Sequence, residues 1–506
     1  MNILYIDIDS LRPDHLGCYG YHRKTSPNID AIAGEGLRFT NCYVPDAPCL
    51  PSRTAMTTGK FGIHTGVVNH GGVASQPHIW GADRGFRCNM TESNWANQFQ
   101  KAGYHTVAFS PFAQRHGAWH WYAGFMEIHN TGGGGMESAD AIDPQVCDWI
   151  SRKGGEEKPF FMWVNVWDPH TPYRTPPDFE NPFKEEPLPD WYDESVRADH
   201  WRKAGPHSAQ EVTGFAGEPV WVPQNKEMHE RFPTIKDLQP TQIDSMDAAR
   251  KMFDGYDMGV AYADQAVGRI IGKLKEAGLY EDTAIIISAD HGENLGELWV
   301  YGDHQTADHV TNRVPLIVRW PGVTDCKAGQ ADDRLLYAFD MGATLMEWSG
   351  LGVPGDWDGQ SFAGDFMDGK TRAGRDSLVL SQLAWCAQRS ARWERYICIE
   401  TYHDGFHDYP RHMVFDLEAD PHEQHNLAVE RPDLVDKGKA ILHDWRAEMR
   451  RSARHTVDPL DTVMAEGGPY HIQEARSGSY LKRLGATGRG EIAERFATRE
   501  HPYRSE

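Results

Sequence analysis

The sequence predicts an α/β protein built on a large, mostly parallel sheet sandwiched by helices, with a smaller C-terminal α+β subdomain. Two observations carry this prediction. Apolar runs of strand length alternate with longer amphipathic stretches, which is typical of parallel strands joined by helices. Acids and histidines also follow directly after three apolar runs, at 7–9, 168–170 and 290–291. In sheets of this kind the functional groups gather at the carboxyl ends of the strands.

The elements of the sheet can be assigned in order along the chain. The first strand lies in "NILYIDID", and "TSPNIDAIAGEG" predicts a capped helix that ends at a glycine. A second helix begins in "SRTAMTTGK", and "TESNWANQFQKAGYHTVAFS" predicts a helix, a glycine stop and a strand. The later elements are a strand in "KPFFMWVNVWDPH", a long amphipathic helix and a buried strand in "AYADQAVGRIIGKLKEAGLYEDTAIIISADHGE", and a strand in "RVPLIVRWPG".

After a main domain over residues 1–375, the pattern changes to short strands followed by one helix, which predicts the α+β subdomain over 376–455. Within the main domain, the insertion at 176–242 is either a lid or a packing loop or oligomer contact, and contains Trp191, Trp201 and Trp221. The tail at 456–506 is Gly-rich and polar, and is either an arm on a neighbouring subunit or loosely held. We therefore expect a homo-oligomer. The "TGGGG" segment at 131–135 predicts a loop.

Composition and charge exclude several classes of protein. A formal net charge of −22 argues against a nucleic-acid partner, and no run approaches the ~20 apolar residues of a membrane helix. The eight cysteines form no C-x-x-C pair, so a zinc knuckle is not expected. The chain opens on a strand without a visible secretion signal, and we expect a cytoplasmic protein with reduced thiols.

The first candidate site is a metal centre. Asp9 ends the first strand, and Asp290 with His291 ends a later one, so two carboxylates and an imidazole would meet at one edge of the sheet. These groups are ligands for a divalent cation. Spacing alone equally allows them to cap the helices that follow. Asp7 lies on the same strand face as Asp9 and is either a second ligand or, as we favour, a buried hydrogen-bonded acid.

Other residues also carry reactive groups. Cys49 lies near Arg53 at the start of a predicted helix, and is either a thiolate nucleophile or a buried core cysteine. His170 is either a general acid or a hydrogen-bonding residue of a turn. His304 and His309, in "GDHQTADH", are metal ligands, anion contacts or solvated loop residues, and spacing alone favours the last of these.

Over most of residues 1–430 these motifs resemble the sulfatase family of the alkaline phosphatase superfamily. The segment "CLPSRTAMTTG" is similar to the family signature, C-x-P-S-R followed by T-G. The other blocks follow the order of the family, and are "IDSLRPDHLGCYGYHRKTSPNIDAIAGEGLRFTNCYV", "WDPHTPY", "SADHGENLGE", "RVPLIVRWPG" and "FDLEADPHEQHNLA". The resemblance implies an alkaline phosphatase-like fold.

In that family the signature cysteine is not used as a thiol. The resemblance implies that a formylglycine-generating enzyme oxidises Cys49 to formylglycine, an aldehyde whose hydrate is a gem-diol. One hydroxyl of the diol attacks sulfur and displaces the alcohol. The second hydroxyl then loses its proton, which expels sulfate and restores the aldehyde. Arg53 and the cation would stabilise charge on the nucleophile and on the transferred group.

The resemblance also assigns the ligands of the metal. Asp9, Asp290, His291 and the diol derived from Cys49 would hold one divalent cation, which by resemblance is calcium, while the histidine ligand leaves manganese open. Ser10 stands where the family usually has a second acid. His170 matches the family histidine that contacts the ester and can protonate the leaving oxygen.

Two departures from the family pattern concern the anion pocket. His304 stands where the family has a sulfate-binding lysine, and would replace it as an anion contact or as the acid that protonates the leaving group. The Lys-x-His of the family falls at 111–113 and is absent, so that Arg115 or His116 would take its place. The loss of two lysines weakens the inference of a highly charged substrate.

The leading prediction is therefore a sulfuric-ester hydrolase for small-molecule sulfate esters, with broad activity that includes aryl sulfates. The alternative is a phosphonate monoester or phosphodiester hydrolase, which would use the same fold, formylglycine and metal and suits a less cationic pocket. A catalytically silent binding protein on this fold is the third reading, and the intact cysteine signature and ligand set argue against it.

Overall fold

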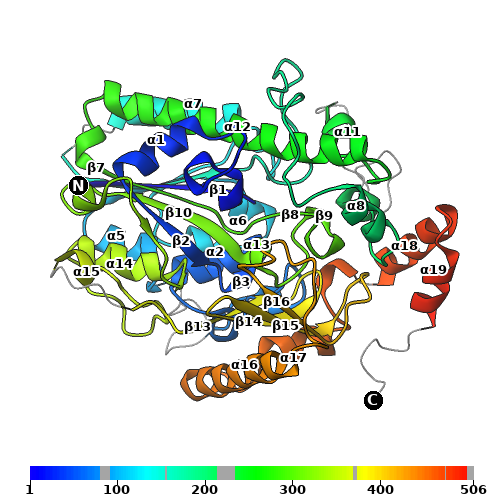
Figure 1. Cartoon of the computed structure of the whole chain (residues 1–506). Helices are drawn as coiled ribbons and strands as arrows, with labels where there is room; N and C mark the ends of the chain where they lie inside the picture. Colours follow the sequence, from blue (N-terminus) through cyan, green and yellow to red (C-terminus); the bar gives the residue numbers. More distant parts are fainter. Residues whose placement is uncertain (80–91, 154–156, 214–233, 368–372, 473, 499–506) are drawn as a thin grey trace.

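The fold is that of a computed structural model, which describes residues 1–79, 92–153, 157–213, 234–367, 373–472 and 474–498. Within these residues the largest sheet has nine strands, in the order β11-β2-β10-β7-β1-β6-β4-β5 with β12 paired to β2 (Figure 1). In chain order its strands are β1 (Asn2–Ile8), β2 (Leu37–Tyr43), β4 (His105–Phe109), β5 (Glu127–His129), β6 (Phe160–Val166), β7 (Thr283–Ser288), β10 (Arg313–Arg319), β11 (Ala331–Asp332) and β12 (Leu336–Tyr337).

The centre of this sheet is parallel and buried. β1 lies between β6 and β7 and runs parallel to both, and every residue of the three strands is buried. β4 and β5 continue the parallel order, whereas β10 runs antiparallel to both β7 and β2. Strands buried on both faces need apolar side chains throughout, which is why they were readable as uninterrupted apolar runs. The prediction of a mostly parallel sheet is confirmed.

Helices cover both faces of the sheet. α1, α7 and α12 lie on one face, and α2, α5 and α14 lie on the other (Figure 1). Their bounds are α1 (Pro27–Glu35), α2 (Cys49–Thr58), α5 (Trp95–Lys101), α7 (Ala139–Lys153), α12 (Met246–Glu276) and α14 (Asp340–Trp348). The helix predicted from residue 261 begins earlier, at Met246, where the hydroxyl of Ser245 accepts the N–H of Ala248 and caps the helix.

A second sheet joins the C-terminal α+β region to the main domain. Among the described residues it has five strands in the order β16-β15-β14-β13-β3, which are β3 (Asp46–Ala47), β13 (Ser377–Gln382), β14 (Ala387–Trp393), β15 (Tyr396–His403) and β16 (His412–Asp416). β3 lies just before α2 in the sequence, and pairs in parallel with Ser381 and Gln382 of β13. The start of α2 is therefore fixed by strands from both ends of the chain.

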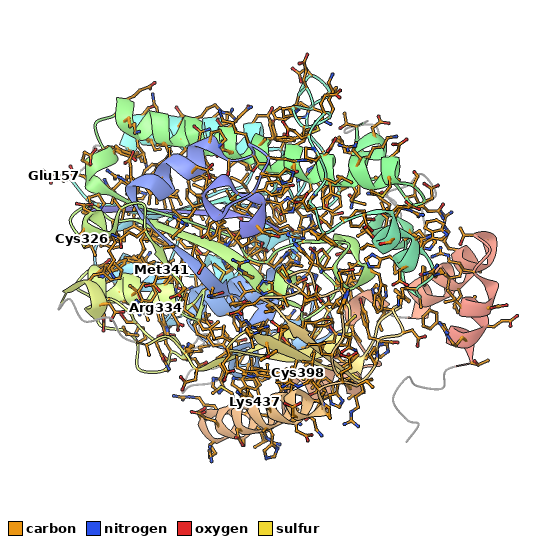
Figure 2. All side chains as sticks on the ribbon, in the orientation of Figure 1. Glu157, Cys326, Arg334, Met341, Cys398 and Lys437 are labelled. Carbon is orange, nitrogen blue, oxygen red and sulfur yellow. The ribbon has the colours of Figure 1, made fainter. Side chains whose placement is uncertain are left out.

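α16 (Pro432–Ser452) covers one face of this second sheet. Leu434 and Leu442 of the helix pack in one buried cluster with Trp393 and Cys398 of the sheet. The amine of Lys437 lies 5.6 Å from the ring centroid of Trp393, and Lys437 and Cys398 are labelled in Figure 2. The predicted strands-then-helix pattern is thus present, and one amphipathic helix closes the subdomain.

The described part of the insertion packs on the main domain. Trp221 lies outside the described residues. Its helices are α8 (Glu194–Trp201), α9 (Ala209–Thr213) and α11 (Ile235–Leu238). Trp191 stacks on His422 with ring centroids 4.2 Å apart, and Trp201 stacks on His207 at 3.6 Å. A role as a lid stays a prediction.

The described part of the tail folds back on its own chain. Its helical segments are α17 (Pro459–Ala465), η8 (Tyr470–Ile472), α18 (Glu474–Ala486) and α19 (Gly490–Ala497). Leu460 and Val463 of α17 pack with Val68 and Ala74. A role as an oligomerisation arm stays a prediction. None of the helices in the described segments is long and apolar enough to cross a membrane.

Asp458 anchors the tail, and its loss should destabilise the fold. Arg389 donates two hydrogen bonds of 2.6 and 2.7 Å to its carboxylate, and both side chains are buried. We expect Asp458→Asn to lower the free energy of unfolding by about 3 kcal/mol, because the buried guanidinium loses its counter-charge. Urea denaturation at pH 7 measures this change.

The matched control is Asp461→Asn, because Asp461 is exposed and pairs with the partly exposed Arg446, so that a change below about 1 kcal/mol is expected. Burial raises the pKa of Asp458, but Arg389 lowers it further, so the net shift is downward. The contribution of this carboxylate is therefore present above its unfolded pKa of about 3.9 and is lost as the pH falls through the folded value. Equal losses in the two variants would contradict the anchoring role.

Candidate active site

Three neighbouring strands end at one site. In the order β7-β1-β6, β7 is followed by Asp290 and His291, β1 by Asp9, and β6 by the segment that contains His170. The amide of Asp9 donates to the carbonyl of Val166 at 2.8 Å, which holds the end of β1 against β6. No described helix begins at Asp9 or Asp290, so the alternative that these acids cap helices is wrong.

The four predicted metal ligands form one buried cluster. One ligand atom from each of Asp9, Cys49, Asp290 and His291 lies within 4.8 Å of each of the others. A cation bound about 2.4 Å from its ligands spans about 4.8 Å between opposite ones, so the cluster has the size of a site for one ion. Cys49 Sγ lies 3.2 Å from His291 Nε2.

Two carboxylate oxygens of the cluster are available to a cation. Asp9 Oδ2 and Asp290 Oδ2 are buried and accept no hydrogen bond from a described residue, although the Arg53 guanidinium forms an ion pair with both. One guanidinium shared among several buried carboxylates leaves part of their negative charge uncompensated, which a further cation would neutralise. Two carboxylates, an imidazole and an oxygen on modified Cys49 are also a donor set that both calcium and manganese accept. The residues therefore fit a divalent cation.

Arg53 supplies positive charge to three buried carboxylates. Its Nε donates to Asp7 Oδ2 at 2.6 Å, and its Nη1 lies 2.7 Å from Asp290 Oδ2 and 3.0 Å from Asp9 Oδ2. Asp7 also accepts a hydrogen bond from Trp163 Nε1 at 3.3 Å. Asp7 is not among the clustered ligands, and its contacts are those of a buried, hydrogen-bonded acid that orients Arg53.

His291 presents an unprotonated nitrogen to the cluster. Its Nδ1 donates to the carbonyl of Gly292 at 2.8 Å, which places the proton of the neutral ring on Nδ1. Burial and the neighbouring His304 lower the pKa of His291 well below its usual value, so the ring stays neutral. A neutral imidazole with an outward hydrogen bond of this kind is the form that binds metals.

Cys49 is the first residue of α2, and Arg53 follows one turn later, so both side chains project from the same face of the helix. Burial, and then the charges of Asp9 and Asp290, raise the pKa of the Cys49 thiol well above its usual value. A protonated thiol is a poor nucleophile, and the geometry does not support the alternative of a free thiolate.

His304 is buried between two acids, and the expectation that it is solvated is wrong. Its Nδ1 lies 3.1 Å from Glu293 Oε2 and 3.6 Å from Asp303 Oδ1. Burial lowers its pKa, but the hydrogen bond to Glu293 and the charge of Asp303 outweigh burial and raise the pKa of His304 to about 9. The ring is therefore a cation at neutral pH, and lies 4.1 Å from His291 and 5.5 Å from His170 between ring centroids.

The two other candidate histidines differ from each other. His170 lies at the site, and its Nδ1 donates to the carbonyl of Thr171, which leaves Nε2 without a proton in the neutral ring. Burial lowers the pKa of His170 well below its usual value. His309 lies apart at the start of α13 (His309–Asn312), where its Nδ1 is 2.9 Å from the hydroxyl of Tyr43. It is buried, so the expectation of a solvated His309 is also wrong.

Three residues shape the site without having been predicted. Ser10 is left-handed, with φ of 62°, and its amide donates to Asp290 Oδ1 at 3.2 Å while its hydroxyl donates to Asp9 Oδ1 at 3.1 Å. It therefore orients both carboxylates, although the sequence marked it only as a missing acid. Glu293 and Asp303 hold His304, and their neighbourhood in the sequence gave no sign that they would converge.

Arg115 is one of the two residues expected to replace the missing Lys-x-His, and this role stays a prediction. Its Nη1 donates to the carbonyl of Gly135 at 2.9 Å, in the predicted loop at 131–135, and its guanidinium lies 5.0 Å from the ring of Trp167. Arg53 lies 5.5 Å from the same ring. His116 is less suited to this role, because burial and then His70 lower its pKa well below the usual value.

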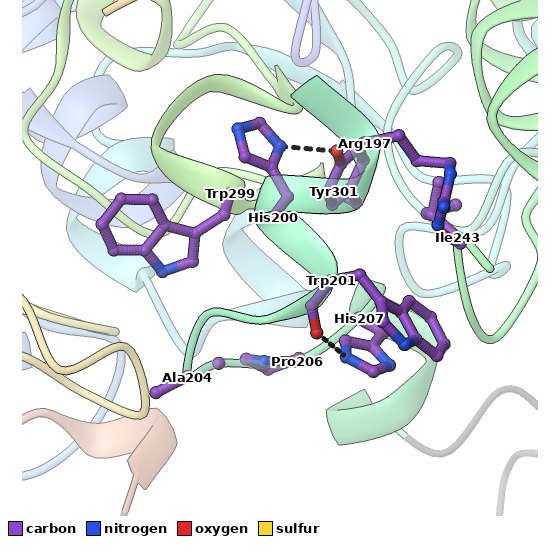
Figure 3. Close-up of a pocket in the computed structure, with 10 residues that line it drawn as sticks. Arg197, His200, Trp201, Ala204, Pro206, His207, Ile243, Trp299 and Tyr301 are labelled. Carbon is purple, nitrogen blue, oxygen red and sulfur yellow. Dashed lines mark hydrogen bonds between the residues drawn. The ribbon is translucent and has the colours of Figure 1, made fainter. Parts of the chain in front are cut away.

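A separate small pocket lies beside the insertion (Figure 3). No predicted site residue lines it, and its walls include Arg197, His200, Trp201, His207, Trp299 and Tyr301. His200 Nδ1 lies 2.6 Å from the hydroxyl of Tyr301, which begins β9 (Tyr301–Asp303), the strand that leads to His304. α8 of the insertion thus supports the strand that positions His304.

Comparison with known proteins identifies the class of this fold and site. The family model described as sulfatase matches residues 1–351, and a model described as the C-terminal part of N-sulphoglucosamine sulphohydrolase matches residues 297–448. The first match covers more than half of the chain. The chain therefore belongs to the sulfatase family.

Similar proteins cover nearly the whole chain. An N-acetylglucosamine-6-O-sulfatase from Bacteroides thetaiotaomicron is 23% identical over 92% of this chain and 89% of its own length. A solved structure in complex with its substrate D-glucosamine-2-N,6-O-disulfate has a TM-score of 0.69 at 21% identity, over 90% of this chain and 99% of that one. A phosphonate monoester hydrolase of Agrobacterium radiobacter has a TM-score of 0.65 at 21% identity, over 88% and 96%. The two solved structures share the fold of this chain.

Replacing single carboxylates should separate a ligand from a supporting acid. We expect Asp290→Asn to weaken binding of the divalent cation at least tenfold, because a charged ligand is lost. Asp7→Asn should keep the metal content of the wild type, because Asp7 pairs with Arg53. Metal analysis after dialysis measures the metal content of each variant, and calorimetric titration with calcium measures its affinity. If Asp7→Asn loses as much metal as Asp290→Asn, Asp7 is a ligand.

Proposed function

We propose that the protein is a sulfuric-ester hydrolase that cleaves sulfate monoesters of small alcohols, aryl sulfates among them. The observation that carries the proposal is the convergence of Cys49 and Arg53, from one signature, on Asp9, Asp290 and His291. Cys49 would act as the hydrate of formylglycine, which a formylglycine-generating enzyme would form from the cysteine. The diol would attack sulfur, in place of a thiol that burial keeps protonated.

The cation would be held by Asp9, Asp290, His291 and the modified Cys49, and we propose calcium, with manganese as the alternative. When bound, it polarises the nucleophile and an oxygen of the ester. Arg53 keeps a donor for the substrate, because its Nη2 is buried and donates to no described acceptor. A guanidinium N–H aimed at a developing anionic oxygen stabilises the transition state by several kcal/mol in sites of this kind, typically about 3–4.

His304 is better placed than His170 to protonate the leaving oxygen. In the neutral ring of His170 the one proton lies on Nδ1 and is donated to Thr171, so Nε2 has none to give. His304 Nδ1 faces the carboxylate of Glu293, and the second acid, Asp303, favours a ring that carries protons on both nitrogens. The His304 cation thereby also supplies charge where the family has a lysine. His170 Nε2 would then act only as an acceptor, for instance of a hydroxyl on the alcohol part of the substrate.

A second candidate is hydrolysis of phosphonate monoesters or phosphodiesters at the same site. The absence of two lysines from the pocket is compatible with this candidate, because such esters carry a single negative charge. The same fold in a phosphonate monoester hydrolase supports it. Sulfate monoesters are also singly charged, so the charge of the pocket suits both classes, and the sulfatase family favours the first.

The remaining parts of the proposal concern the setting of the protein. We propose that it works in the cytoplasm, where Cys49 stays reduced until it is modified, and that it forms a homo-oligomer. The substrate would be a small molecule, and neither nucleic acid nor a membrane would be a partner.

The modification of Cys49 can be tested on one tryptic peptide, residues 39–53, which also contains Cys42 as an internal control. After alkylation of active protein, we expect Cys42 to be alkylated and Cys49 to have the mass of formylglycine or its hydrate. Cys49→Ala should reduce hydrolysis of 4-nitrophenyl sulfate to background. Full activity in protein with both cysteines alkylated would rule out formylglycine.

The proton donor can be tested by varying the leaving group. We expect His304→Ala to lower kcat/KM about 100-fold for sulfate esters of weakly acidic phenols, which need a proton on the leaving oxygen. The loss should be smaller for 4-nitrophenyl sulfate, whose leaving group is stable as an anion. His170→Ala serves as the comparison, because its loss should not depend on the leaving group. The reverse pattern would make His170 the acid.

The two candidate functions can be separated by comparing the activity on aryl sulfates with that on matched aryl phosphodiesters and phosphonate esters in the same assays.

A further inference from the structure

Three imidazoles lie beside the nucleophile helix, outside the predicted metal cluster. His70 lies between α3 (Gly62–Thr65) and η3 (Val73–Ser75), His116 follows α6 (Phe112–Arg115), and His471 belongs to η8 of the tail. The ring centroid of His70 lies 4.9 Å from that of His116 and 5.0 Å from that of His471. Residues of the tail thus reach the neighbourhood of Cys49.

His70 contacts the backbone next to the nucleophile. The amide of Leu50, the residue after Cys49, donates to His70 Nε2 at 3.5 Å. This amide belongs to the first turn of α2, whose N–H groups have no acceptor inside the helix, and Pro48 offers no side-chain cap. His70 therefore serves as an acceptor for an otherwise unpaired amide at the buried start of α2.

The hydrogen bonds also define the protons on the two rings. A nitrogen that accepts the Leu50 amide carries no proton, so the neutral His70 ring is protonated on Nδ1. His70 Nδ1 lies 2.9 Å from His471 Nε2 and donates to it. A chain of hydrogen bonds thus runs from His471 through His70 to the backbone beside Cys49.

The tail holds His471 in a fixed position. Its ring stacks on Trp385, with centroids 4.3 Å apart and an angle of 20° between the planes. Its amide donates to the carbonyl of Ala384 at 2.9 Å. Both contacts lie at the turn between β13 and β14, so the second sheet carries the ring.

The segment of His70 and the tail segment of His471 are also joined by the side chain of Asn69, which binds a backbone amide of each. Asn69 Oδ1 accepts the amide of His70 at 2.8 Å and that of Tyr470 at 3.3 Å. The ring of Tyr470 lies on Gly71, where an added Cβ would come within 2.1 Å of it. Gly71 therefore permits a close approach that a larger residue would prevent.

We propose that His70 is a positioning residue for the nucleophile, and that His471 fixes its tautomer, so that the tail completes the active site of its own chain. The inference rests on the proposed function, because it concerns the same nucleophile. If His70 carried its proton on Nε2, two donors would face each other at Leu50 and the start of α2 would shift. Because His70 contacts the backbone beside Cys49, the effect should fall on turnover more than on substrate affinity.

The test uses the full-length protein with His471→Phe, which keeps a ring on Trp385 but cannot accept a hydrogen bond, and His471→Gln, which restores an acceptor. We expect kcat for 4-nitrophenyl sulfate to fall about three- to tenfold in His471→Phe, as for loss of one hydrogen bond. KM should stay within about twofold of the wild type, and His471→Gln should recover most of kcat. His443→Phe, at an exposed histidine of α16, is the matched control.

Two further measurements separate positioning from damage. The melting temperature and the formylglycine content of the 39–53 peptide should match the control in each variant. Equal turnover in His471→Phe and His443→Phe, or equal loss in the Phe and Gln variants, would overturn the proposal.

A spectroscopic readout keeps the inference independent of activity. In protein labelled with ¹⁵N-histidine, we expect His70, assigned by its absence in His70→Gln, to show the tautomer protonated on Nδ1, and to lose this preference in His471→Phe. If the wild type hydrolyses no ester, the proposed function fails and this spectrum alone decides the inference. A His70 ring protonated on Nε2, or a spectrum unchanged in His471→Phe, would overturn it.

Discussion

The buried charge of Arg53 is the interaction on which the rest of the site depends. Asp7, Asp9 and Asp290 bring three fully buried carboxylates to the ends of β1 and β7. Carboxylates at such a depth are tolerated only with a cation in contact, and one guanidinium reaches all three. Because Arg53 and Cys49 lie on one face of α2, the ion pairs that stabilise the buried carboxylates also hold Cys49 against the sheet.

The nucleophile helix lies between two sheets, and each fixes a different part of it. The main sheet supplies the acids and histidines that the side chains of α2 face. The second sheet holds β3, just before Cys49, against β13, and carries Trp385 and His471 at its turn. The C-terminal region therefore belongs to the same structural unit as the catalytic residues, although a change of pattern separates it in the sequence.

The central sheet could be predicted because it depends on local signals, whereas spacing alone left the candidate metal ligands open to other roles, and their full set came from the resemblance to the sulfatase family. Uninterrupted apolar runs mark the buried strands, and the polar residues at their ends follow directly. The elements that were missed depend on distant partners. β14 reads "AQRSARW", and its polar side chains are buried through contacts such as the pair of Arg389 with Asp458. The spacing of its segment alone predicts a solvated His304, but the structure buries it between Asp303, its neighbour in the sequence, and Glu293 from another segment.

The burial of Cys49 has a consequence for the order of events during synthesis. Cys49 is 1% exposed in the folded chain, and His291, one of the residues that enclose it, comes 242 residues later. At about 5–20 residues per second, that interval lasts roughly 10–50 s. Folding of the main sheet cannot close over the cysteine before then. An enzyme that oxidises this side chain needs access to it before the sheet closes over it, and translation alone provides at least this interval.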